Sequence, residues 1–196
     1  MGVRTSYVGV VSIVAFALCV LTSFDIAMAQ TQQRPKLGIV GQQAPAWKTS
    51  SWHQLPSDKK EKETLDITDY KDKVVYLYFF QSWCPGCHSK GFPTLKKVSD
   101  ELKDNDKVAF VAIQTTFEGH SVNTADKLKT IADRYKLKIP FGQSAGKSGT
   151  PDIMRKYRTG GTPWVVIIDR QGRVVHNGHH VDADRTIKAI KQLAGK

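Results

Sequence analysis

The sequence contains little cysteine, with three such residues in 196. Cys19 lies in an apolar segment near the N-terminus, so Cys84 and Cys87 are the only two in the rest of the chain. Two thiols are too few for a disulfide-rich scaffold or for a zinc site with four thiolate ligands. A disulfide between positions three apart would close a very short loop and add little entropic stabilisation. The spacing therefore indicates chemistry at the two sulfurs rather than a structural crosslink.

The sequence also lacks an apolar run long enough to span a bilayer. The run Val8–Leu21 is shorter than the ~20 residues that a membrane-spanning helix needs. It follows Arg4 and precedes an Ala-Met-Ala triplet at 27–29, which places small residues where signal peptidase reads them. We interpret residues 1–29 as a secretory signal peptide, with an N-terminal membrane anchor as the alternative. We therefore expect an exported, periplasmic protein in which residues 30–40 form a flexible tether.

Basic residues interleaved with aromatic ones are missing as well, although the formal net charge is +11. The lysines are scattered along the chain, so the charge favours solubility or anionic partners in general. Together with the export signal, this scatter argues against nucleic acid as a partner.

Three continuous apolar runs, rich in β-branched and aromatic residues, predict buried strands. They are Val74–Phe80, Val108–Ile113 and Trp164–Ile168. A turn at 169–172 predicts that residues 173–176 return as an antiparallel strand. The sequence therefore predicts an α/β fold with a mixed β-sheet.

Helical patterns fall between and after these runs. Apolar stripes predict helices from Phe92 to Leu102, from Val122 to Tyr135 and from Ile187 to Leu193. Thr150 and Pro151 together resemble the start of a short helix that ends at Tyr157. Asp182 or Asp184 is expected to cap the C-terminal helix. These helices would flank the sheet on both faces.

The segment Cys84-Pro85-Gly86-Cys87 joins the first predicted strand to the helix after it. Pro85 suits the first helical position, because its missing N–H would have no partner there. The sulfur of Cys84 would then face the free N–H groups of the helix, which lower the pKa of a thiol. Cys87 would lie one turn further in and be more buried. We interpret Cys84 as the attacking nucleophile and Cys87 as the thiol that resolves the mixed disulfide.

These features resemble the thioredoxin superfamily, and within it the exported TlpA-like (redoxin) group of thiol–disulfide oxidoreductases. The similarity covers about Gly41 to Leu193. The matching segments are 41–45 (GQQAP), 70–73 (YKDK), 80–87 (FQSWCPGC) and 160–169 (GGTPWVVIID). The resemblance implies a thioredoxin-like fold for residues 41–196, with a central mixed β-sheet flanked by helices, and no cofactor or metal.

The resemblance also implies roles for residues around the pair. Pro163 would form a cis peptide opposite the cysteines, and Thr162 would contact the sulfurs and offer its backbone to a bound substrate. Trp83 would either pack beside the pair or shield the thiolate. Pro85 and Gly86 would tune the reduction potential. The expected substrates are cysteine-containing proteins, reduced rather than oxidised, and a redox partner would recycle the pair.

The sequence departs from the thioredoxin pattern at three points. Tyr78 stands six residues before the first cysteine, where thioredoxins carry a buried carboxylate, so proton transfer must use water or another group. The dipeptide between the cysteines is Pro-Gly rather than Gly-Pro, which leaves the reduction potential open. Pro93 lies one residue further from Cys87 than the usual kink, and this predicts an irregular helix there.

Two alternatives start from the same segment. His88 completes a C-x-x-C-H motif, which is typical of c-type haem attachment. A buried strand leading into Cys84 is the wrong context for haem, and His88 would otherwise be a surface helix residue near the site. A peroxiredoxin would carry Thr or Ser three residues before its cysteine, where this chain has Gln81.

A third alternative is a copper-binding protein of the same fold. His176, His179 and His180 lie near the last predicted strand, although only His176 and His180 would share a strand face. Two tryptophans, Trp83 and Trp164, are expected to flank the cysteines, so fluorescence should report their redox state.

Overall fold

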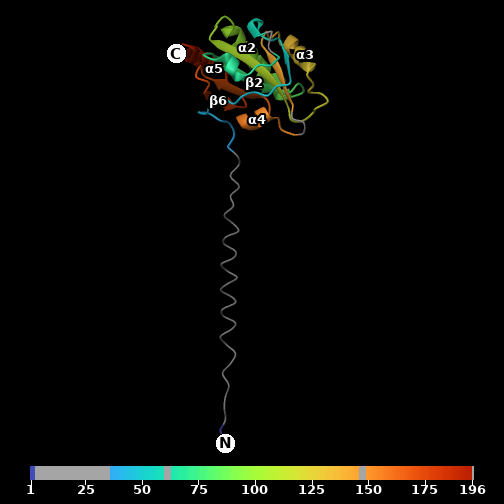
Figure 1. Cartoon of the computed structure of the whole chain (residues 1–196), viewed down its shortest axis with the longest axis vertical. Coiled ribbons are helices and arrows are strands. Elements are labelled where there is room, and N and C mark those ends of the chain that lie inside the picture. Colours follow the sequence, from blue (N-terminus) through green and yellow to red (C-terminus); the bar gives the residue numbers. More distant parts are fainter. Residues whose placement is uncertain (3–35, 60–62, 146–148, 196) are drawn as a thin grey trace. The chain divides into compact units, whose positions relative to one another are not determined.

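A computed structural model describes residues 1–2, 36–59, 63–145 and 149–195. Almost all of the predicted signal peptide and most of the tether therefore lie outside the described residues. Residues from Lys36 onward form one compact unit (Figure 1). Within the described part of the chain, no helix combines the length and the apolar character needed to cross a bilayer.

A six-stranded mixed sheet forms the centre of this unit, in the order β1-β4-β3-β2-β5-β6. Strands β2, β3 and β4 are parallel, whereas β1, β5 and β6 run antiparallel to their neighbours. The bounds are β1 Ser51–His53, β2 Val74–Phe80, β3 Val108–Thr116, β4 Phe141–Ala145, β5 Trp164–Ile168 and β6 Val174–Gly178. The mixed sheet, the three apolar strands and the closing hairpin are confirmed.

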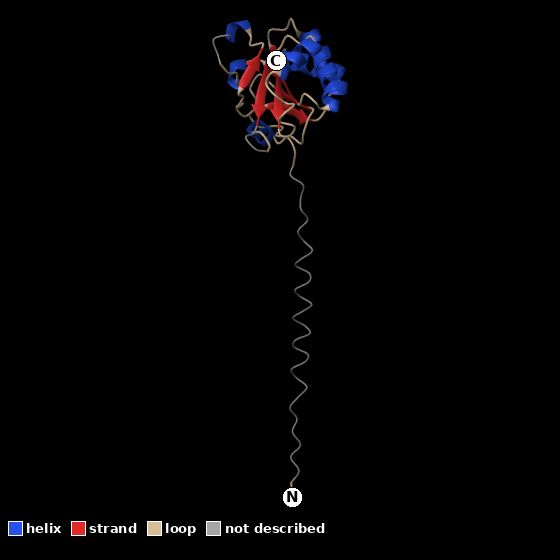
Figure 2. Ribbon diagram, turned by 90° about the vertical axis from the view of Figure 1, so that its right-hand side faces the viewer, coloured by secondary structure: helices blue, strands red, loops and turns tan. Residues whose placement is uncertain are grey.

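Helices lie on both sides of the sheet, as Figure 2 shows in blue against the red strands. The helical segments are η1 Ser57–Lys59, η2 Ile67–Tyr70, η3 Cys87–Gly91, α2 Phe92–Leu102, α3 Lys127–Arg134, α4 Asp152–Tyr157 and α5 Ala183–Ala194. Asp182 caps α5 by accepting a hydrogen bond from Arg185 N, as predicted. Pro151 rather than Thr150 precedes α4, and α3 begins five residues after Val122, which is exposed.

The side chains of β2 alternate between two hydrophobic clusters, one on each face of the sheet. The cluster that contains Tyr76, Tyr78 and both cysteines is covered by α2, α3 and α5, and we call it the cysteine face. The cluster on the other side contains residues of α4, η2 and the N-terminal segment, and we call it the α4 face. All seven residues of β2 are buried, because each face of the sheet is covered.

Sequence reasoning missed β1 and β4, and it predicted β3 too short. β4 has the sequence FGQSA, and the added end of β3 is Gln114–Thr116, so neither is an apolar run. These polar side chains are largely buried and hydrogen-bond to one another, although Gln114 Oε1 has no partner among the described residues. Gln114 Nε2 donates to Gln143 Oε1 at 2.6 Å, and Gln143 Nε2 donates to Thr116 Oγ1 at 2.8 Å. Such pairing makes burial of polar groups acceptable, and hydropathy alone does not reveal it.

The end of the predicted tether contacts the domain. Ile39 is 3% exposed and belongs to the cluster of the α4 face. Gly38 N–H donates to Arg158 O at 2.9 Å, and Gly41 N–H donates to Val174 O at 2.8 Å. The folded unit therefore starts a few residues before Gly41.

Candidate active site

The two cysteines lie where β2 passes into the helical segment, at the carboxyl end of the strand. Pro85 is the first helical residue, as predicted, and Cys84 immediately precedes it. Both residues are free thiols in the structure. Cys84 retains 6% exposure and Cys87 none. The backbone N–H of Cys87 donates to Cys84 Sγ at 3.2 Å, so the start of the helix presents a donor to the outer sulfur.

The loop before β5 faces the outer sulfur. The peptide between Thr162 and Pro163 is cis. The thiol of Cys84 donates to the carbonyl oxygen of Thr162 at 3.5 Å. A Cβ atom on Gly86 would lie 3.2 Å from Pro163 Cδ, so glycine allows this loop to approach the turn between the cysteines. The structure thus brings Thr162 and Pro163 against the segment 84–87, although the two segments are far apart in the chain.

The inner sulfur is electrostatically different from a solvent-exposed thiol. Burial, together with the hydrogen bond to Cys84, raises the pKa of Cys87 to about 12. The backbone of Gln81 and the hydroxyl of Tyr78 lower this pKa in part. Cys87 is therefore a neutral thiol at physiological pH, and it needs help to become a nucleophile.

The helix after the cysteines is irregular, as the position of Pro93 predicts. Residues Cys87–Gly91 form a π-helical turn, and α2 continues from Phe92 with proline in its first turn. The N–H of Phe92 donates to the carbonyl of Cys87, which is the five-residue spacing of a π-helix. Such turns occur frequently at functional sites.

His88 is not the surface residue that the sequence suggests. Its Nε2 contacts Ser82 O at 2.6 Å, and its Nδ1 contacts the hydroxyl of Tyr135 at 2.6 Å. Because Ser82 O can only accept, Nε2 carries a proton. The backbone N–H of Ser82 in turn donates to Asn123 Oδ1 at 2.7 Å. His88 and Asn123 therefore hold the loop that leads into Cys84.

Sequence reasoning missed Ser82, Asn123 and Tyr135. Each interaction joins residues that are between 6 and 47 positions apart in the chain. No local motif signals a contact of this kind.

This geometry also tests the haem alternative. Covalent haem attachment needs both cysteine sulfurs and a histidine nitrogen to reach the cofactor. Cys87 is wholly buried in the hydrophobic cluster of the cysteine face, and both ring nitrogens of His88 have partners. The residues present do not fit covalently attached haem.

The two tryptophans expected to flank the cysteines lie in different places. Trp83 is 47% exposed, beside Cys84, and its Nε1 approaches Gly119. Trp164 is buried in the cluster of the α4 face, and its Nε1 donates to Asn177 Oδ1 at 2.5 Å. Trp164 therefore packs on the other side of the sheet from the sulfurs.

The three histidines near the last strand do not converge. His179 packs edge-on against Trp164 with ring centroids 4.4 Å apart, and its Nδ1 lies 3.3 Å from Pro163 O. Burial lowers the pKa of His176. Only His176 lies within β6, since the strand ends at Gly178. Among the described residues, no group of three His, Cys, Asp or Glu side chains lies close enough to hold a metal ion.

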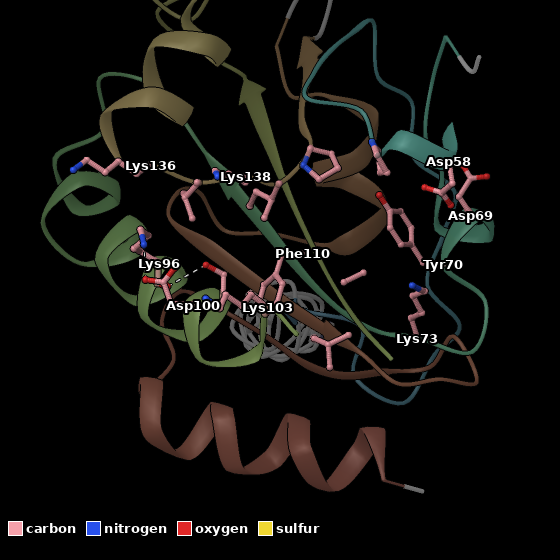
Figure 3. A pocket seen from close by; sticks show the side chains of 17 residues that line it. Asp58, Asp69, Tyr70, Lys73, Lys96, Asp100, Lys103, Phe110, Lys136 and Lys138 are labelled. Atoms are coloured by element: carbon pink, nitrogen blue, oxygen red, sulfur yellow. Dashed lines mark hydrogen bonds and ion pairs between the residues drawn. The ribbon is translucent and has the colours of Figure 1, made fainter. Parts of the chain in front are cut away.

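A cavity of about 540 Å³ lies away from the cysteines (Figure 3). It is lined by the start of β3, by α2 and by the segment before β4, with Lys96, Lys103 and Lys138 at its wall. Val108, in its lining, pairs with Val74 at the start of β2, whereas Cys84 follows the end of β2. The cavity therefore lies at the opposite end of the central strands and plays no part in the geometry of the sulfurs.

Comparison with known proteins identifies related chains. The Redoxin family model matches residues 39–193. The thioredoxin-like protein YneN of Bacillus subtilis is 31% identical over 153 residues, which cover 76% of this chain and 78% of YneN. The thiol-disulfide oxidoreductase ResA of Bacillus cereus is 25% identical over 163 residues, covering 83% of this chain and 82% of ResA.

A solved structure shows the same fold. The thioredoxin-like superfamily protein SPOA0173 superposes with a TM-score of 0.70 at 29% identity, over 79% of this chain and 97% of its own. The mixed sheet with helices on both faces is thus the fold of a thioredoxin-like protein. The chain belongs to the Redoxin family, in the TlpA-like group of the thioredoxin superfamily, and is a protein-disulfide oxidoreductase.

Proposed function

We propose that the chain reduces disulfides in exported proteins through Cys84 and Cys87. The observation that carries this proposal is the position of Cys84 Sγ, between the N–H of Cys87 and the carbonyl of Thr162. The outer sulfur is the only one of the pair with any exposure. A substrate disulfide can therefore reach Cys84 and not Cys87.

The reaction follows from this difference in access. Cys84 attacks as a thiolate, the substrate disulfide breaks, and a mixed disulfide joins Cys84 to the substrate. Cys87 then attacks Cys84 Sγ, the Cys84–Cys87 disulfide forms, and the substrate leaves with its second sulfur reduced. Backbone groups of Thr162 and the ring of Trp83 would contact the substrate chain, while Pro85 and Gly86 set the turn that holds the sulfurs.

The direction of transfer is part of the proposal. Strong oxidants of this fold have a stabilised reduced form. Burial keeps Cys87 a neutral thiol, so any stabilisation of the reduced pair must come from Cys84, and the reduction potential decides the direction. A separate redox partner would return two electrons to the oxidised pair after each cycle.

Two measurements test the proposal. The reduction potential of the pair should lie near the ~−270 mV of thioredoxin, and a value near the ~−120 mV of DsbA would reverse the direction. Cys84→Ser should abolish reduction of a protein disulfide, whereas Cys87→Ser should accumulate a mixed disulfide visible by mass spectrometry. Full activity in the Cys84→Ser variant would refute the assigned roles.

We also propose that residues 1–29 direct export to the periplasm. The support is the sequence pattern of Arg4, the apolar run and the Ala-Met-Ala triplet. N-terminal sequencing of the expressed protein should begin at Gln30. A chain that keeps its first residues and sediments with membranes would instead show an anchor.

A further inference from the structure

Tyr78 places a hydroxyl group beneath the sulfur pair. The residue lies in β2 with 0% exposure, and it shares the cysteine face with Cys87. Its hydroxyl is buried and has no hydrogen-bond partner among the described residues. A buried hydroxyl without a partner is costly, and such a group requires an explanation.

The helix after the cysteines is shaped around this hydroxyl. A Cβ atom on Gly91 would lie 1.9 Å from Tyr78 Oη and 2.7 Å from Cζ. Gly91 is the last residue of the π-helical turn that begins at Cys87. The absence of a side chain there is what lets the tyrosine reach up to the turn. Glycine in the interior of a helix is unfavourable by about 0.5–1 kcal/mol relative to alanine, so making room for the hydroxyl of Tyr78 lowers the stability of the helix.

The hydroxyl and the thiol of Cys87 are close enough to act on each other's ionisation. Burial, followed by the interaction with Cys87, raises the pKa of Tyr78 well above its ordinary value. In return the hydroxyl of Tyr78 lowers the pKa of Cys87, against the larger effect of burial. The other titratable groups that act on this pair are Cys84, Tyr76 and Tyr135. Tyr78 thus remains protonated and can donate but cannot accept the proton of Cys87.

We propose that Tyr78 is a positioning residue for the second half of the reaction, in which its hydroxyl donates a hydrogen bond to the Cys87 thiolate. In the dithiol the hydroxyl lies near Cys87 without a hydrogen bond of good geometry, and the interaction strengthens when Cys87 loses its proton. The thiolate then attacks Cys84 Sγ, the bond from Cys84 to the substrate sulfur breaks, and the Cys84–Cys87 disulfide forms. The proton lost by Cys87 ends on the departing substrate sulfur, and Tyr78 keeps its own. This inference rests on the proposed function of the pair.

The test separates the two halves of the reaction in the full-length protein. Tyr78→Phe removes only the hydroxyl. The first half, attack by Cys84, is followed as the rate at which reduced Cys84 reacts with iodoacetamide. The second half, attack by Cys87, is followed by preparing a mixed disulfide between Cys84 and a small aromatic thiol and measuring how fast that thiol is released. A hydrogen bond to a charged group is lost, so release should slow by about 10- to 100-fold. The pH at which release accelerates should rise, and alkylation of Cys84 should stay unchanged.

Tyr76→Phe is the matched control. Tyr76 lies two residues earlier on the same face of β2, is equally buried, and also has a hydroxyl without a partner among the described residues. This variant should release thiol at the wild-type rate. Equal rates in both variants, or equal slowing, would overturn the inference by showing that the tyrosines act only through packing.

A second measurement keeps the native side-chain shape. Growth on 3-fluorotyrosine gives a hydroxyl that is a stronger donor, and release should become faster in the wild-type chain but not in Tyr78→Phe. An unchanged rate in the fluorinated wild type would also overturn the inference. If the wild type does not reduce disulfides at all, the proposed function of the pair fails. If it does so and Tyr78→Phe matches Tyr76→Phe, only the role of Tyr78 fails.

Discussion

Two buried tyrosines, Tyr157 on the α4 face and Tyr78 on the cysteine face, differ in how their hydroxyls are bonded. On the α4 face, Trp47 Nε1 donates to Tyr157 Oη at 3.1 Å, and Tyr157 Oη donates to Pro45 O at 3.0 Å. On the cysteine face, the hydroxyls of Tyr76 and Tyr78 have no partner among the described residues. Tyr157 is thus bonded on both sides, although the hydroxyl of Tyr70 on the same face also lacks a partner among the described residues. The cysteine face keeps a free donor near a sulfur whose charge changes during the reaction.

The same contrast appears in backbone geometry. Around the sulfurs the chain uses a π-helical turn, a glycine in contact with Pro163 and a second glycine under Tyr78. α4, on the opposite face, is a regular helix that ends with the left-handed residue Arg158. The π-helical turn and these two glycines lie where the chemistry is, and changes on the two faces should separate activity from stability.

The largest effect is expected from Gly86→Ala. Its Cβ would lie 3.2 Å from Pro163 Cδ, so the turn and the facing loop must move apart near Cys84. A misplacement of about 1 Å can cost roughly 100-fold in rate; the shift needed here is a few tenths of an ångström, so we expect a loss on the order of 10-fold in disulfide reduction. Gly195→Ala is the control, because its nearest contact would be an ordinary 3.4 Å. Equal activity of the two variants would show that the close approach is not required.

Tyr157→Phe should do the opposite of Gly86→Ala: it should lower the stability of the fold and leave the rate of disulfide reduction unchanged. The variant removes the acceptor of Trp47 Nε1 and leaves that group buried without a partner. The free energy of unfolding in urea should fall by about 1–3 kcal/mol, while the rate of disulfide reduction should match that of the wild type. Tyr76→Phe should be nearly neutral in the same assay. A comparable destabilisation of both would mean that the hydrogen bonds of Tyr157 add no stability of their own.

The raised pKa of Cys87 makes the stability of the reduced protein depend on pH. The folded state holds the proton up to about pH 12, whereas the unfolded chain releases it near pH 9. The contribution of Cys87 to the free energy of unfolding is therefore complete below about pH 9 and is lost as pH rises toward 12. Over this range the free energy of unfolding falls by at most about 1.4 kcal/mol per pH unit. Cys87→Ala should lack this slope in urea unfolding from pH 8 to 10.5. Parallel curves for both proteins would contradict the assigned burial of the thiol.

The smallest effect is expected in tryptophan emission. Trp83 lies next to Cys84, and Trp164 packs on the α4 face. Oxidation of the pair should change emission through Trp83, because a nearby sulfur group changes its environment. Trp83→Phe should remove most of the redox response, and Trp164→Phe should keep it. A response lost in Trp164→Phe instead would show that the sheet transmits the change between its faces.

Sequence reasoning succeeded where the signal was local. Apolar runs predicted β2, β3 and β5, and Pro93 predicted the irregular helix that the π-turn provides. It failed at β4, because Gln143 is made compatible with burial by partners that arrive from β3. It also misplaced His88, whose environment depends on Ser82 and Tyr135.

The sequence by itself determined the fold class and the kind of chemistry. It also gave the hypothesis that Cys84 attacks and Cys87 resolves. Spacing, hydropathy and the position of Pro85 are properties of neighbouring residues, so they can be read along the chain. Only the tertiary structure decided that Tyr78 lies beneath Cys87, that Gly91 makes room for it, and that Trp164 faces away from the sulfurs. These three positions depend on which face of β2 is covered by the helical segment after Cys84 and on how closely that segment packs. No local pattern in the sequence encodes a packing distance.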